Sequence, residues 1–63
     1  MDRNSLMEAI ATRAGESRIG LAQVWAEAGI SATSLHRWRK GKCIPKMPTI
    51  GKLETALERL TAQ

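Results

Sequence analysis

A glycine between two short amphipathic segments constrains this chain more than any other residue. Gly29 follows the segment Leu21–Ala28 and precedes the segment Ser31–Lys40. In both segments apolar residues recur at helical spacing. A turn this tight needs one residue at positive φ, and glycine takes that conformation without a side-chain clash. The sequence therefore predicts two helices that meet at a rigid corner.

The second of these segments has two different faces. Ser31 is a suitable N-cap, and Leu35 and Trp38 lie three residues apart on one face. The other face begins with small residues and ends with basic ones, and comprises Ala32, Thr33, His36, Arg37 and Lys40. We expect the apolar face to pack on the core and the other face to meet solvent or a ligand. Gly41 is expected to end the helix.

A further helix is predicted before this pair. Ser5 and Glu8 have the spacing of a capping box, in which each side chain bonds the other's backbone amide. Apolar residues then recur at helical spacing as far as Ala14. Gly15 suits the left-handed residue that closes a helix. These signals predict a helix over about Ser5–Ala14.

Another helix is predicted after the pair. Pro45 and Pro48 oppose helical structure in the loop before it, and Thr49 is a plausible N-cap. The leucines and Ile50 then recur at helical spacing, which predicts a helix over about Ile50–Thr61. Two methionines are expected to be core or packing residues, namely Met7 and Met47.

Length and composition limit the classes of function. The 63 residues make a single domain, 1–63, and a chain of this size buries only about 60% of its unfolded surface. Cys43 is the only cysteine and His36 the only histidine, so an internal disulfide is excluded, and these two residues cannot make a zinc site without more ligands. We see no catalytic constellation and expect no enzyme activity, no metal and no cofactor. A partner subunit is the expected additional support.

The balance of charge favours a polyanionic partner. The net charge is +4, and the stretch from Arg37 to Lys46 holds five cations and no acid. A single unpaired cysteine, no signal peptide and no long apolar run predict a cytoplasmic protein without a membrane segment. There is no room for a separate ligand-binding domain, so we expect no small-molecule ligand.

Two helices joined by a short glycine-containing turn are typical of the helix-turn-helix, which places its second helix in the major groove of DNA. The ordered set of motifs extends this likeness over about Ile19 to Leu60. It consists of Ala28-Gly29-Ile30-Ser31, Leu35, Trp38-Arg39-Lys40-Gly41, Pro45, Pro48-Thr49-Ile50 and the leucines from Leu53 to Leu57. In this set the chain resembles the lambda-repressor-like (XRE-type) helix-turn-helix family.

The resemblance implies a compact all-α domain of four helices, or of five, with the helix-turn-helix at residues 21–40. It implies a sequence-specific regulator that binds double-stranded DNA, a small repressor of phage, plasmid or antitoxin type. Such proteins usually bind a palindromic operator as homodimers. By position, the residues that face the bases would be Ala32, Thr33, His36 and Arg37. Those that face phosphates would be Ser31, Lys40, Lys42 and Lys46.

Three positions depart from the family pattern. Trp25 stands where the family has a small residue at the crossing of the two helices, so either the crossing is wider or the indole turns outward, where it could join a dimer surface. Leu21 replaces a glutamine that contacts a phosphate. The chain ends after the fourth predicted helix, whereas many members dimerise through a fifth.

Other interpretations remain open at this point. Arg37 can read guanine, contact a phosphate or stay solvated, and the lysines can form a solvated charge run. One alternative function is a helical protein-interaction adaptor that has lost DNA binding. An RNA-binding role is disfavoured, because sequence-specific RNA reading uses aromatic stacking and the chain has only two Trp and no Tyr or Phe.

Overall fold

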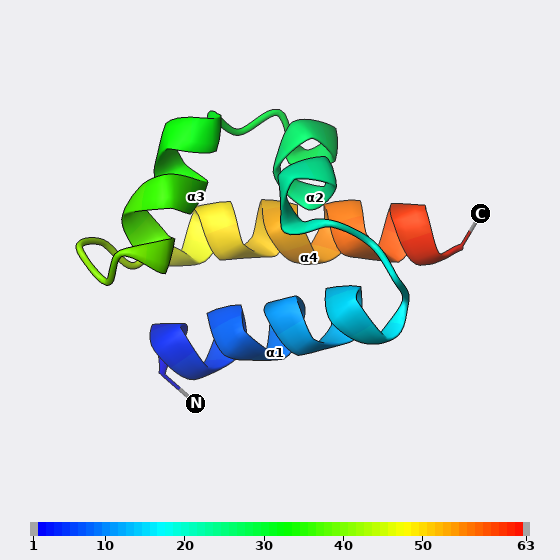
Figure 1. Cartoon of the computed structure of the whole chain (residues 1–63), viewed down its shortest axis with the longest axis horizontal. Coiled ribbons are helices and arrows are strands. Elements are labelled where there is room, and N and C mark those ends of the chain that lie inside the picture. The colour runs from blue at the N-terminus through cyan, green and yellow to red at the C-terminus, as the bar shows by residue number, and fades with distance from the viewer. Residues whose placement is uncertain (1, 63) are drawn as a thin grey trace.

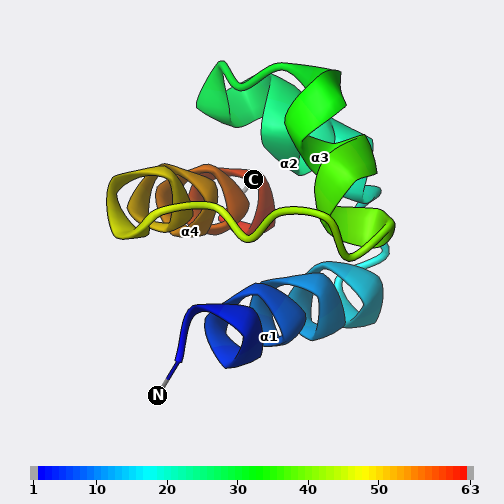
Figure 2. The same cartoon turned by 90° about the vertical axis from the view of Figure 1, so that its left-hand side faces the viewer.

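The helices stack in layers around one long central helix. The computed structural model describes residues 2–62, and its four helices are α1 (Arg3–Glu16), α2 (Leu21–Ala28), α3 (Ala32–Arg39) and α4 (Met47–Thr61). In Figure 1, α4 lies between α1 on one side and the α2–α3 pair on the other. Figure 2 shows α1 and α4 side by side, running in the same direction. No helix within residues 2–62 has the length and apolar character needed to cross a bilayer.

All four helices contribute to a single hydrophobic core. Its centre is Trp25, the largest of the buried side chains, which is only 1% exposed. Around it pack the other buried apolar residues, which are Met7, Ile10, Ala14, Val24, Leu35, Ile50, Leu53, Ala56 and Leu57. The leucines and Ile50, whose spacing predicted the last helix, thus lie on its buried face. Residues 2–62 contain helices and no strand, which confirms the all-helical prediction for this part of the chain.

The burial of Trp25 decides between the two orientations that the sequence left open. Its indole points inward and stacks on that of Trp38, with ring centroids 6.2 Å apart and ring planes 21° apart. The cost is that its Nε1 has no hydrogen-bond partner among the described residues, an effect of about 1–3 kcal/mol. Burying an aromatic side chain of about 150–250 Å² stabilises by about 4–6 kcal/mol. This gain exceeds the cost of the unpaired Nε1, so the inward orientation of Trp25 is favoured.

The first helix begins earlier than predicted, at Arg3. Its N-cap is Asp2, whose Oδ1 accepts the Ser5 amide N–H at 2.7 Å. The predicted capping box of Ser5 and Glu8 is therefore wrong, because Ser5 already lies inside the first turn. The hydrogen bond from the Ser5 amide stabilises the charged carboxylate and lowers the pKa of Asp2.

The last helix also begins earlier than predicted, at Met47 instead of Ile50, and its N-cap is Lys46 instead of Thr49. Pro48 lies within the first turn. The first four amides of a helix have no partner within it, so a proline there removes no hydrogen bond. The prediction failed because it treated both prolines of this loop as helix breakers. Pro45, by contrast, is buried outside the helix.

Three helices end in the same way, with one residue at positive φ. At the end of α2 this residue is Gly29 (φ 73°) and at the end of α3 it is Gly41 (φ 72°), as predicted. In each case its N–H donates to the carbonyl three residues back, and the next N–H donates to the carbonyl five residues back. This pattern is the Schellman motif. It satisfies carbonyls that the helix end would leave unpaired.

The third example, at the end of α1, corrects the role given to Gly15. Gly15 lies within α1, and the residue at positive φ is Arg18 (φ 58°). The Arg18 amide donates to the Gly15 carbonyl at 3.1 Å, and the Ile19 amide donates to the Ala14 carbonyl at 2.8 Å. A left-handed conformation costs a residue with a side chain about 1–2 kcal/mol. Backbone strain is therefore located at Arg18.

We predict that Arg18→Gly stabilises the protein. The substitution removes the left-handed penalty, while the greater freedom of glycine in the unfolded chain offsets part of the gain. The free energy of unfolding should rise by up to about 1 kcal/mol, as measured by urea denaturation. Gly41→Ala, at the equivalent position of α3, is the matched control and should destabilise by about 1 kcal/mol. Equal destabilisation by both changes would contradict this account of α1.

Candidate nucleic-acid interface

Helix α3 is the most peripheral helix of the bundle. Within the described chain its backbone packs against α2 and against no other helix, and it lies at the edge of the molecule in Figure 1. The three residues Gly29–Ser31 connect it to α2. Leu35 is its one fully buried side chain, and Trp38 is half-buried against the core. One face of α3 therefore holds it in place and the rest faces outward.

The outward surface of α3 holds the four residues predicted to face DNA bases. Ala32, Thr33, His36 and Arg37 are all exposed. Arg39 is exposed as well, and the sequence interpretation did not assign it a role. It lies three residues after His36 and four after the buried Leu35, which places it at the edge between the outward and the buried face of the helix.

The first turn of α3 is organised by Ser31, the predicted N-cap. Its Oγ accepts the Thr33 amide at 3.2 Å, and its carbonyl accepts the Ser34 amide at 3.1 Å. Two of the amides that could face a phosphate are thus already bonded within the turn. Ser31 is exposed, and its hydroxyl proton can still be donated outward.

The predicted phosphate contacts after α3 lie on a loop that is held at its start and in its middle. The Lys42 amide donates to the Arg37 carbonyl at 3.0 Å, which fixes the path of the chain as it leaves the helix. Pro45 is buried and anchors the middle of the loop. Lys40, Lys42 and Lys46 are exposed, so three cations follow the basic end of α3.

No acidic side chain interrupts this region of the sequence. The chain has no Asp or Glu between Glu27 and Glu54. An exposed surface of one sign raises the local concentration of ions of the opposite sign. The outward face of α3 and the loop after it, here called the basic face, therefore form a surface suited to a polyanion.

Two large apolar side chains are exposed in the loop after α3 and at the start of α4. Ile44 is 39% exposed and Met47 is 55% exposed. The sequence had indicated that both Met7 and Met47 are packing residues, which holds for Met7 but is wrong for Met47. Met47 is the first residue of α4, one turn before the buried face of that helix begins at Ile50.

Comparisons with family models, curated proteins and solved structures found no match to this chain. Within residues 2–62, no three His, Cys, Asp or Glu side chains gather in a group that could hold a metal ion. Cys43 is exposed and unpaired. The features of the described chain that bear on function are therefore the exposed residues of α3 and the basic loop after it.

We predict that two substitutions separate the structural role of Ser31 from any role in binding. Ser31→Ala removes the cap and should lower the free energy of unfolding by about 1 kcal/mol. Ser31→Asp keeps an acceptor for the Thr33 amide and adds negative charge at the helix N-terminus, so stability should be retained. Thermal unfolding of the two variants tests this, and a loss of stability in Ser31→Asp equal to that in Ser31→Ala would contradict it.

Proposed function

We propose that this protein is a sequence-specific regulator that binds double-stranded DNA, of the small repressor type. In this proposal α2, the turn Gly29–Ser31 and α3 form a lambda-repressor-like helix-turn-helix. The observation that carries it is the combination of a peripheral α3, whose outward residues are exposed, with an acid-free basic loop at its end. The family resemblance supports the same conclusion.

The proposed mechanism divides the basic face into two parts. The outward side of α3 enters the major groove, where small residues at its start let the backbone approach the base edges. Arg37 is the candidate for bidentate hydrogen bonding to guanine, worth about 1–3 kcal/mol of discrimination. Ser31 and the three lysines contact phosphates, which sets the position of α3 without reading sequence.

The test of the proposed function is selection of bound sequences from a random duplex pool. We expect an enriched palindrome, with affinity of about 10⁻⁸–10⁻¹¹ M at physiological salt. A palindrome would also indicate a homodimer with two-fold symmetry. If no sequence is enriched even at low salt, the proposal is wrong.

The two parts of the basic face should respond differently to substitution. Arg37→Ala should relax the sequence preference at one position of each half-site, at a cost of about 1–3 kcal/mol for the preferred duplex. Lys42→Ala should weaken binding to all duplexes alike and reduce the slope of log affinity against log salt concentration by about one. Fluorescence anisotropy over a salt series measures both effects.

The matched control for these variants is Arg13→Ala, which removes an exposed cation from α1, on the far side of α4 from α3 (Figure 1). It should change neither the sequence preference nor the salt slope. If Arg37→Ala and Lys42→Ala lose affinity equally for the preferred and random duplexes, the assignment of base and phosphate roles is wrong.

The exposed side chains of Ile44 and Met47 favour a second candidate, a helical protein-interaction adaptor. Exposed apolar side chains in the loop and at the start of α4 can anchor a protein partner. The two candidates make opposite predictions for the duplex selection. An adaptor would enrich no sequence, and Met47→Lys would abolish its partner binding instead of strengthening the attraction to DNA.

A further inference from the structure

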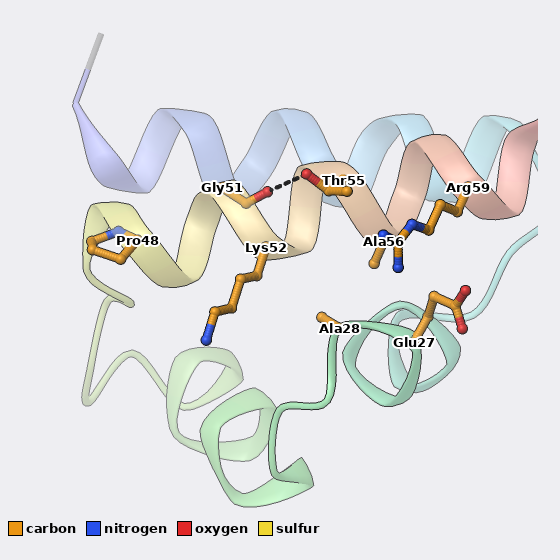
Figure 3. A pocket seen from close by; sticks show the side chains of 8 residues that line it. All are labelled: Glu27, Ala28, Pro48, Gly51, Lys52, Thr55, Ala56 and Arg59. Carbon is orange, nitrogen blue, oxygen red and sulfur yellow. Dashed lines mark hydrogen bonds between the residues drawn. The ribbon is translucent and has the colours of Figure 1, made fainter.

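A groove lies between α2 and α4. Its volume is about 540 Å³, and it is lined by Glu27, Ala28, Pro48, Gly51, Lys52, Thr55, Ala56 and Arg59. Figure 3 shows these side chains, with α4 forming one wall and the end of α2 forming the other. None of the residues assigned to bases or phosphates lines it.

The two walls of the groove carry charges of opposite sign. Glu27 projects from the α2 wall, whereas Lys52 and Arg59 project from the α4 wall (Figure 3). The one hydrogen bond drawn among the lining residues runs from the Thr55 hydroxyl to the Gly51 carbonyl, at 3.0 Å. Glu27 and Arg59 are both exposed, and no hydrogen bond joins them. Both charges can therefore meet an external partner.

Gly51 leaves the α4 wall of the groove open to an external contact. It lies inside α4, where glycine costs about 1 kcal/mol relative to alanine. Nothing in the described chain explains it, because a Cβ there would meet no atom within 4 Å and its φ is not positive. A glycine at this position, with no side chain, leaves room for the close approach of another backbone.

We propose that a second copy of this chain docks on this groove across a two-fold axis. A two-fold interface uses the same surface on both subunits. When the axis runs along the groove, the α2 wall of one copy lies against the α4 wall of the other. Glu27 of each copy then faces the cations of its partner, and Gly51 leaves room for α2 of the partner to approach α4 closely. An acidic peptide would pair with Lys52 and Arg59 but would be repelled by Glu27.

The proposal rests on the proposed function in one respect, since it supplies an interface for the dimer that a palindromic operator requires. None of the residues assigned to bases or phosphates lines the groove, so the two proposals use different side chains. Self-association is measured without DNA, and DNA selection is measured separately. The two proposals can therefore fail independently.

The test is a charge exchange followed by sedimentation equilibrium. The wild-type protein should dimerise, and Glu27→Arg or Arg59→Glu alone should weaken the dimer by about tenfold or more, because like charges then face each other twice. An equimolar mixture of the two variants should restore dimers as heterodimers, since each new charge meets its opposite. The double variant should restore homodimers. Circular dichroism checks that every variant is folded.

Matched controls use exposed residues of α1. Glu8→Arg and Arg13→Glu make the same charge changes away from the groove and should leave the dimer unchanged. Gly51→Leu should prevent dimerisation without unfolding the chain, whereas Gly15→Leu, at another helical glycine with no neighbour within 4 Å of its Cβ position, should not.

Three results would overturn the interface: a monomeric wild-type protein, a dimer unaffected by either single reversal, or a mixture of variants that stays monomeric. A monomer that still enriches a DNA sequence overturns the interface and leaves the proposed function intact. A dimer that shows the expected charge dependence but enriches no DNA sequence overturns the proposed function and leaves the interface intact.

Discussion

The contact between Trp25 and Trp38 is the interaction on which the position of α3 depends. The backbone of α3 packs against α2 alone, so side chains must hold it at its angle. The stacked indoles join the two helices across 6.2 Å between ring centroids, and Leu35 adds a buried contact. An aromatic pair adds about 0.5–1.5 kcal/mol to the burial of its area. A rigid angle is what groove reading would require of α3, since its side chains must meet base edges at fixed positions.

The helix ends show where the chain tolerates strain and where it avoids it. The same hydrogen-bonded motif closes α1, α2 and α3, and each needs a residue at positive φ. Glycine fills that place on both sides of α3, at Gly29 and Gly41, whereas Arg18 fills it after α1. The two turns that direct α3 and its loop are thus free of this penalty. The strained residue lies in the connection between α1 and α2, outside the basic face.

The surface is divided into regions of different electrostatic character. The basic face extends from α3 into a loop that Pro45 anchors in the core, and its charge has one sign. The groove between α2 and α4 has one wall of each sign, which suits a copy of itself better than a polyanion. A net charge of +4 on each copy opposes association of two copies. Association therefore requires a surface where opposite charges face each other locally.

The features that could be predicted from the sequence are those that depend on a few neighbouring residues. The bounds of α2, the N-cap at Ser31 and the left-handed glycines at Gly29 and Gly41 all follow from local backbone rules, and the exposed residues of α3 follow from helical spacing. Local rules failed where two signals competed, as at Asp2 against Ser5 and at Pro48 within the first turn of α4. The inward orientation of Trp25, the exposure of Met47 and the groove between α2 and α4 became visible only in the packed structure. These depend on how much space the packed helices leave, and that space is set by contacts between segments far apart in the chain.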